Sequence, residues 1–323
     1  MLATFVIALA ATPIFRKIAK RYKVLAFPNH RTVHEGTIPK LGGGSIYFSF
    51  LIGMFVVWLI QPQLYNEHLV QMASLIIGAL VLFIMGAFDD KLDLPCNFKL
   101  ILETLVAIIA VMLGWKIESI MLPAGQSLSL GVLAYPLSVL WIVGITNSVN
   151  MIDGLDGLAA GISIVVAVVT LAVAGLFGNP MLVTLAIVLI GALTGFLCFN
   201  INPASIFMGD SGSLSLGFLL ACITLKASAI VPGKSVILIP MLLLGLPITD
   251  TTLAIIRRVR RGIHPFHADR EHIHHRLVRL GLSQSGAALV MIGISMVFGI
   301  MAYLVAQGVY TDMKLFSHFS QLP

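Results

Sequence analysis

Long apolar segments recur along this chain, and they restrict its fold more than any other feature. About ten runs approach the ~20 residues that a helix needs to cross a bilayer. We place them at residues 1–15, 42–60, 69–88, 99–114, 132–147, 158–177, 181–199, 213–231, 235–254 and 285–307. Only 11% of the residues are charged, against roughly a quarter in soluble domains. The sequence therefore predicts an all-α polytopic membrane protein with about ten transmembrane helices.

Positive charge falls on one side of this arrangement. With the N-terminus outside, sixteen of the twenty Lys and Arg residues lie in or beside the loops at 16–41, 89–98, 148–157, 200–212 and 255–284. The positive-inside rule makes these loops cytoplasmic. The first apolar run precedes its basic cluster, the reverse of a signal peptide, so we expect an uncleaved helix. Basic residues beside helices are typical of topology and of contact with anionic lipid, so no nucleic-acid partner is expected.

Acidic motifs and a histidine-rich loop lie on the same predicted cytoplasmic side. They are Asp89-Asp90-Lys91-Leu92-Asp93, the segment 147–157, Phe207-Met208-Gly209-Asp210 and the loop 257–279. Charge beside a membrane is costly unless it faces water, a metal or a partner. A solvated acidic turn also accounts for the first motif alone, and helix capping for the third. Together they indicate chemistry at the bilayer interface on a divalent metal.

Two of these motifs favour particular ligands. Adjacent Asp89 and Asp90 repel each other and need a cation, a proton or water, and hard oxygen ligands suit Mg²⁺. The loop 257–279 holds five histidines, His264, His267, His272, His274 and His275. Beside arginines, they suit an anionic pyrophosphate, with structural zinc as the alternative.

Another motif repeats a polar residue every three positions, at Asn147, Asn150, Asp153 and Asp156. On a helix this spacing places the four side chains along one face. Turn residues in an interfacial loop are the alternative. The glycines of Leu41-Gly42-Gly43-Gly44 do not form a phosphate loop, and close helix packing is their expected role.

Together these motifs resemble the polyprenyl-phosphate N-acetylhexosamine-1-phosphate transferase superfamily over nearly the whole chain. The similarity is carried by 28–31, 39–43, the Asp89 motif, the segment 147–158, the segment 207–212 and the histidine loop. Residues 265–277 resemble the branch that uses UDP-N-acetylglucosamine. Two positions depart from the family pattern, since Ala26 stands where an Asp is common and Thr32 where a Lys is usual.

The resemblance implies a single transmembrane catalytic domain, 1–323, in the bacterial inner membrane with a cytoplasmic active site. The implied reaction moves N-acetylglucosamine-1-phosphate from UDP-N-acetylglucosamine to undecaprenyl phosphate and releases UMP. It would depend on Mg²⁺, with Mn²⁺ as an alternative ion, and would begin a cell-envelope glycan such as teichoic acid or lipopolysaccharide. Another UDP-N-acetylhexosamine is the alternative donor. The sequence leaves the polymer and a homodimer open.

The resemblance also implies residue roles, which suit a reaction that needs alignment and charge neutralisation. Asp210 is expected to bind the metal, and Asp89 and Asp90 to position or deprotonate the lipid phosphate. The expected substrate and metal contacts are Asp153, Asp156, Asn147 and Asn150 for nucleotide or metal, Phe207 for uracil, Lys99 for a phosphate, and His272, His274, His275 and Arg276 for pyrophosphate or sugar.

Two alternatives concern mechanism and function class. Direct displacement is favoured over double displacement through Asp89 or Asp90, because two anionic substrates on one metal need no enzyme intermediate. A transporter would instead line a path at mid-membrane with charge, where the candidates are Lys226, Glu103 and Asp250.

Overall fold

The chain folds into a bundle of long helices with two short antiparallel strand pairs. The computed structural model describes residues 1–26, 37–122, 126–229, 235–262 and 271–319. The described helices are α1 (Leu2–Arg21), α2 (Gly43–Ile60), α3 (Pro62–Glu67), α4 (Leu69–Leu92), α5 (Cys96–Met112), η2 (Gly131–Leu133), α6 (Ala134–Ile152), α7 (Leu158–Leu176), α8 (Pro180–Asn200), α9 (Gly209–Ser228), α10 (Leu238–Leu243), α11 (Gly245–Arg260), α12 (Ile273–Arg279) and α13 (Gln284–Phe319). Strand β1 (Leu25–Ala26) pairs with β2 (Ile38–Pro39), and β3 (Ser119–Met121) with β4 (Ser127–Ser129). The predicted all-α membrane fold class is confirmed.

Eight helices in the described part of the chain are long and apolar enough to cross a membrane. They are α1, α2, α4, α6 with η2, α7, α8, α9 and α13. The fourth predicted span, 99–114, is the shorter helix α5. It has 17 residues, because it starts after Pro95 and ends just before the turn at Gly114. At ~1.5 Å per residue it falls slightly short of a ~30 Å hydrocarbon core.

The ninth predicted span, 235–254, is two helices instead of one. Helix α10 ends at Leu243 and α11 begins at Gly245, with Pro240 and Pro247 on either side of the break. Proline lacks the N–H that a continuous helix needs, and its ring crowds the preceding turn. The apolar composition of the run conceals this break. The described residues thus hold eight spans by length and composition, and the other two predicted positions are occupied by α5 and by the α10–α11 pair.

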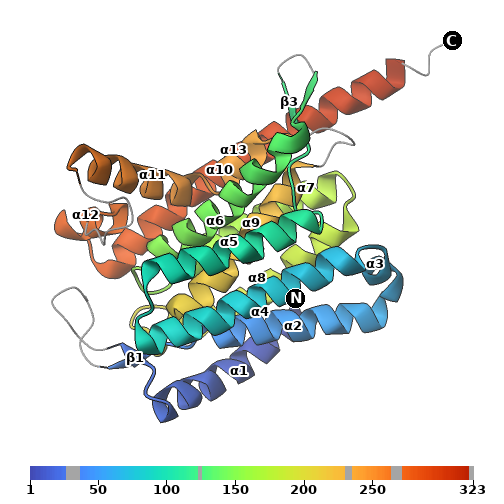
Figure 1. Cartoon of the computed structure of the whole chain (residues 1–323). Coiled ribbons are helices and arrows are strands. Elements are labelled where there is room, and N and C mark those ends of the chain that lie inside the picture. The colour runs from blue at the N-terminus through green and yellow to red at the C-terminus, as the bar shows by residue number, and fades with distance from the viewer. Residues whose placement is uncertain (27–36, 123–125, 230–234, 263–270, 320–323) are drawn as a thin grey trace.

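The helices lie side by side, so that the loops gather at two opposite ends of the bundle. Figure 1 shows β1 and α12 at one end and α3 and β3 at the other. The ends of α4 and α6 and the start of α9, which carry the acidic motifs, all lie at the end with β1 and α12. The structure thus confirms that motifs far apart in sequence share one face.

Helix α9 occupies the centre of the bundle. It packs against α2, α4, α6, α7, α8 and α10, and almost all of its residues are buried. It also has the lowest mean hydropathy of the eight spans. Three buried serines on it, Ser211, Ser213 and Ser215, are compatible with this position because small residues let neighbouring helices approach closely. The first half of α9 therefore combines burial with small polar side chains.

The crossing of α2 and α9 gives the first prediction. A Cβ placed on Gly43 would fall on the backbone of Gly212, so Gly43→Ala must force the helices apart. Overpacking of this kind costs about 1–3 kcal/mol, and we expect a lower unfolding temperature in detergent. Gly144→Ala is the control, since a Cβ there meets nothing within 4 Å. Equal unfolding temperatures for the two variants would contradict the close approach.

Candidate active site

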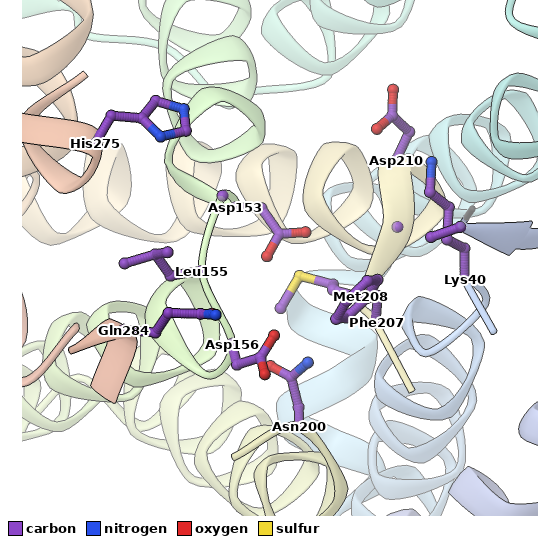
Figure 2. Close-up of a pocket in the computed structure, with 13 residues that line it drawn as sticks. Lys40, Asp153, Leu155, Asp156, Asn200, Phe207, Met208, Asp210, His275 and Gln284 are labelled. Carbon is purple, nitrogen blue, oxygen red and sulfur yellow. The ribbon is translucent and has the colours of Figure 1, made fainter. Parts of the chain in front are cut away.

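A cavity of about 300 Å³ opens at the end of the bundle that carries the acidic motifs. Its walls come from the loops after α6 and α8, the start of α9, the β1–β2 region, α12 and the first residue of α13. Figure 2 shows five of the predicted site residues around it, Asp153, Asp156, Phe207, Asp210 and His275. Ala26 also lies in the wall, so one departure from the family pattern falls within the site. Thr32 lies outside the described residues.

The start of α9 is held in place by Asp90. Both carboxylate oxygens of Asp90 accept backbone hydrogen bonds, from the N–H groups of Asp210 at 3.0 Å and Ser211 at 3.1 Å. The Asp90 side chain is fully buried. Gly209, at a φ of +73°, lies so close to this carboxylate that a Cβ would collide with it. Asp90 is thus the N-terminal cap of α9, a role that the sequence suggested for Asp210.

Asp89, Lys99 and Asp210 form a charged row beside this cap. The Lys99 ammonium donates to Asp89 at 2.6 Å and lies 3.5 Å from the Asp210 carboxylate. The other oxygen of Asp89 accepts from the backbone N–H of Leu94 at 2.7 Å. Asp210 is the more accessible acid, with 31% of its side chain exposed against 4% for Asp89. The row therefore presents one carboxylate and one ammonium to an incoming ligand.

The loop between α6 and α7 contributes two carboxylates with different surroundings. Asp156 accepts hydrogen bonds from the side chain of Asn202 at 2.9 Å and from the backbone of Ala204 at 3.0 Å. Asp153 has no hydrogen-bond partner for its carboxylate within the described residues. Burial, and next the charge of Asp90, raise the pKa of Asp153 to about 7. Asp153 is therefore the carboxylate of this site that most needs a cation.

The two asparagines of the same motif lie away from the cavity lining. Asn147 donates to the buried Glu103 on α5 and to the carbonyl of Val143 at 2.9 Å. Asn150 accepts from the hydroxyl of Ser213 on α9 at 2.9 Å. Both side chains tie α6 to its neighbours. The predicted common face holds only in part, because α6 ends at Ile152 and the two aspartates belong to the following loop.

Of the predicted histidine-loop residues, His275 reaches the cavity wall. His272 contacts Asp250 through Nδ1 at 2.8 Å. His274 is 1% exposed, and neither of its ring nitrogens has a hydrogen-bond partner among the described residues. Arg276 lies 3.5 Å from Glu271. His264 and His267 lie outside the described residues.

Three residues with polar or charged side chains in the cavity wall have no role in the predicted site: Lys40, Asn200 and Gln284. Lys40 is placed by the pairing of its own segment with the loop before α9, where Gly42 donates to Phe207 at 2.9 Å and Phe207 donates to Pro39 at 2.8 Å. Asn200 joins two loops, accepting from Gly157 and donating to Ile206, both at 3.0 Å. A polar residue closing the apolar run of α8 is the signal that could have identified Asn200.

The donor set suits Mg²⁺ better than a metal held by protein alone. In the described part of the chain, no three His, Cys, Asp or Glu side chains are grouped so that they could hold a metal ion. Mg²⁺ is usually bound by one or two carboxylates together with substrate phosphates. Asp210 and Asp153 both line the cavity, so its wall offers carboxylates to an ion that is also bound by substrate phosphates.

Comparison with known proteins decides the family. The model of glycosyl transferase family 4 matches residues 72–228. A Bacillus subtilis protein named as a probable undecaprenyl-phosphate N-acetylglucosaminyl 1-phosphate transferase is 40% identical over 299 residues, covering 92% of this chain and 81% of the relative. The chain therefore belongs to glycosyl transferase family 4.

Two further relatives extend the comparison. A decaprenyl-phosphate N-acetylglucosaminephosphotransferase of Mycolicibacterium smegmatis is 31% identical over 96% of this chain and 82% of its own length. An Escherichia coli undecaprenyl-phosphate alpha-N-acetylglucosaminyl 1-phosphate transferase is 29% identical over 94% of this chain and 80% of its own. The family member described here is thus a multi-pass membrane enzyme, a phosphoglycosyl transferase.

The cap on α9 yields the second prediction. Asp90→Ala removes two hydrogen bonds to a charged acceptor, each worth about 1.5–3 kcal/mol, and frees the turn that carries Asp210. We expect a lower unfolding temperature and at least ~10-fold slower turnover. Asp90→Asn keeps one acceptor oxygen, so its unfolding temperature and turnover should fall between those of wild type and Asp90→Ala. Asp93→Asn, at an exposed position of the same motif, is the control. Wild-type stability of Asp90→Ala would rule out the capping role.

The pKa of Asp153 yields the third prediction. The folded state keeps its proton up to about pH 7, whereas the unfolded chain loses it near 3.9. Ionisation therefore costs stability as pH rises between these values. Asp153→Asn cannot ionise, so in EDTA it should unfold at a higher temperature than wild type at pH 8, and the difference should shrink toward pH 4. A difference that grows as pH falls would show that the pKa is not raised.

Proposed function

We propose that this enzyme transfers N-acetylglucosamine-1-phosphate from UDP-N-acetylglucosamine to undecaprenyl phosphate and releases UMP. The supporting observation is a cavity lined by the carboxylates Asp153 and Asp210 and the cation Lys40, with Lys99 3.5 Å from Asp210 beside it. A nucleotide diphosphate and a lipid phosphate both need cations and a metal there. The names of the relatives at 40% and 29% identity support the sugar and the lipid.

The site fits a Mg²⁺ ion held by Asp210 and Asp153, with Mn²⁺ as a substitute. Bound there, the ion would neutralise the pyrophosphate and the leaving UMP. The chain's own residues supply the remaining contacts. Lys40 and His275 face the cavity from opposite sides and are assigned to donor phosphates and sugar, and Phe207 offers an aromatic face to uracil.

The acceptor phosphate is assigned to the charged row of Asp89, Lys99 and Asp210. Lys99 is held between the two acids, so its ammonium is oriented before a phosphate arrives. An oxygen of the lipid phosphate attacks the β-phosphorus of the donor. A new P–O bond forms as the bond to the UMP oxygen breaks, and the electron pair leaves with UMP. A lipid phosphate is largely dianionic near neutral pH, so deprotonation is a small part of the task.

The bonding of Asp89 and Asp90 favours direct displacement. Double displacement needs one of these carboxylates to be free to attack phosphorus. Asp89 uses one oxygen for Leu94 and the other for Lys99, while Asp90 caps α9 with both. Asp89 therefore serves here to orient Lys99, and Asp90 to orient Asp210.

The orientation in the membrane is proposed from charge. Most of the Lys and Arg residues belong to the segments at the cavity end of the bundle, which supports a cytoplasmic position for the site by the positive-inside rule. The product would begin a lipid-linked envelope glycan. Glu103 and Asp250, two of the charges that a transporter would use, are instead paired with Asn147 and His272.

Transfer of radiolabel from UDP-N-acetylglucosamine into an organic-extractable lipid tests the proposal. Asp210→Asn removes the most accessible carboxylate of the charged row and should lower the rate by at least ~10³-fold, about 4 kcal/mol. EDTA should abolish transfer, and Mg²⁺ or Mn²⁺ should restore it. Asp312→Asn, at an exposed position near the far end of α13, should match wild type.

Two results would overturn parts of this assignment. Wild-type rates for Asp210→Asn at saturating Mg²⁺ would remove Asp210 from the metal site. Efficient use of UDP-N-acetylmuramoyl-pentapeptide in place of UDP-N-acetylglucosamine would show that the donor is misassigned while leaving the family intact.

A further inference from the structure

A buried carboxylate on α11, outside the cavity lining, holds the start of the histidine segment. Asp250 is 1% exposed. One of its oxygens lies 2.8 Å from Nδ1 of His272, and the other accepts the backbone N–H of Ile273 at 2.8 Å. A single side chain therefore fixes both the first backbone donor of α12 and the ring that precedes it. A carboxylate at Nδ1 also favours the tautomer with its proton on that nitrogen.

The rings that follow are ordered by this contact. His274 stacks on His272 with centroids 5.8 Å apart and planes 7° apart, and its ring centroid lies 4.2 Å from that of His275. The other side of His274 lies against Gly154, where an added Cβ would collide with the ring. Gly154 and His275 both belong to the cavity wall. A continuous chain of contacts thus runs from Asp250 to the loop that carries Asp153 and Asp156.

The seat of His274 excludes a charged ring. Burial, with the neighbouring His275 and His272, lowers the pKa of His274 to about 3, and in the part of the chain that the structure describes neither ring nitrogen has a hydrogen-bond partner. A neutral ring packed in this way acts through its shape, as a spacer between α12 and Gly154. The position of the His274 ring therefore depends on the contacts that hold the neighbouring backbone of α12 in place.

A second anchor of the segment is more exposed. Glu271 contacts Arg257 at 3.5 Å, Arg261 at 2.7 Å and Arg276 at 3.5 Å. The side chains of Arg261 and Arg276 are more than half exposed, so water and salt weaken these pairs. The Asp250 contacts are shielded from both. Asp250 is buried and bonds directly to His272 and Ile273, so it fixes the start of the segment 272–275.

We propose that Asp250 is a positioning residue for the donor nucleotide sugar, acting through His272 to seat His274 against Gly154 and to hold His275 in the cavity wall. The proposal rests on the proposed function for the identity of the donor. It differs from simple capping of α12 in one consequence: loss of Asp250 should impair donor binding selectively. Asp89 and Lys99 of the charged row lie on α4 and α5 and bond to each other, whereas the contacts of Asp250 are made by α11 and the start of α12.

The kinetic test separates the two substrates. Asp250→Ala should raise the KM for UDP-N-acetylglucosamine at least tenfold and leave the KM for undecaprenyl phosphate within twofold. Asp250→Asn retains one acceptor for Ile273, should show a smaller rise, and covers the case in which Asp250→Ala lowers the amount of folded protein. Thr251→Ala is the matched control, because Thr251 is the next residue in the chain and its buried hydroxyl has no hydrogen-bond partner among the described residues. This variant should keep both KM values.

Chemical modification tests the same contacts without turnover. Diethyl pyrocarbonate modifies neutral, accessible histidines, so His274 should be protected in wild type and in Thr251→Ala but modified in Asp250→Ala, as read by peptide mass spectrometry. Unchanged protection, an unchanged donor KM, or an equal rise in both KM values would overturn the positioning role. Absence of any transfer by the wild type would instead defeat the proposed function, while the modification pattern would still decide the role of Asp250.

Discussion

The rest of the site depends on the two hydrogen bonds that Asp90 accepts from the first turn of α9. Four N–H groups at the start of any helix lack partners within the helix, and they need other acceptors when the first turn is packed against neighbouring helices, as in α9. A carboxylate from α4 satisfies two of them and is itself compensated by the partial positive charge of the helix end. These hydrogen bonds fix α4 against α9, and they thereby hold Asp89 and Asp210 of the charged row in place.

The same constraint explains the tight backbone around the cavity. Backbone hydrogen bonds join the segment of Lys40 and Gly42 to the loop before α9. The two segments come this close because Gly43 and Gly212 have no side chains to hold the helices apart. Asn200 and Asp156 add further side-chain bonds to backbone N–H groups. Each loop of the site is thus held by its neighbours, which lets carboxylates keep their places without a ligand.

Much of this could be predicted from sequence, and the failures have physical causes. Apolar runs identify helices because the hydrocarbon core offers backbone polar groups no other partners, and α5 was predicted in this way as the span 99–114. The break between α10 and α11 was missed, because it is set by Pro240 and Pro247 within a run that is apolar throughout. Asp153 and Asp210 were found because acids at helix ends are rare in so apolar a chain. Asp250 was considered as a charge at mid-membrane, and Lys40 was given no role in the predicted site. Both were misjudged because the residues around them in the fold are distant in sequence. Asn147 and Asn150 had the right spacing, yet α6 ends too early for a common face.

The central position of α9 bears on how the protein reaches its folded state. A segment enters the membrane from the translocon according to its own apolarity, and by that measure α9 is the weakest of the eight spans although it is the most enclosed. Its partners α2, α4, α6, α7 and α8 all precede it in the chain, and synthesis proceeds from the N-terminus. The order of the helices therefore lets a polar, serine-bearing helix insert into a protein environment that is already present.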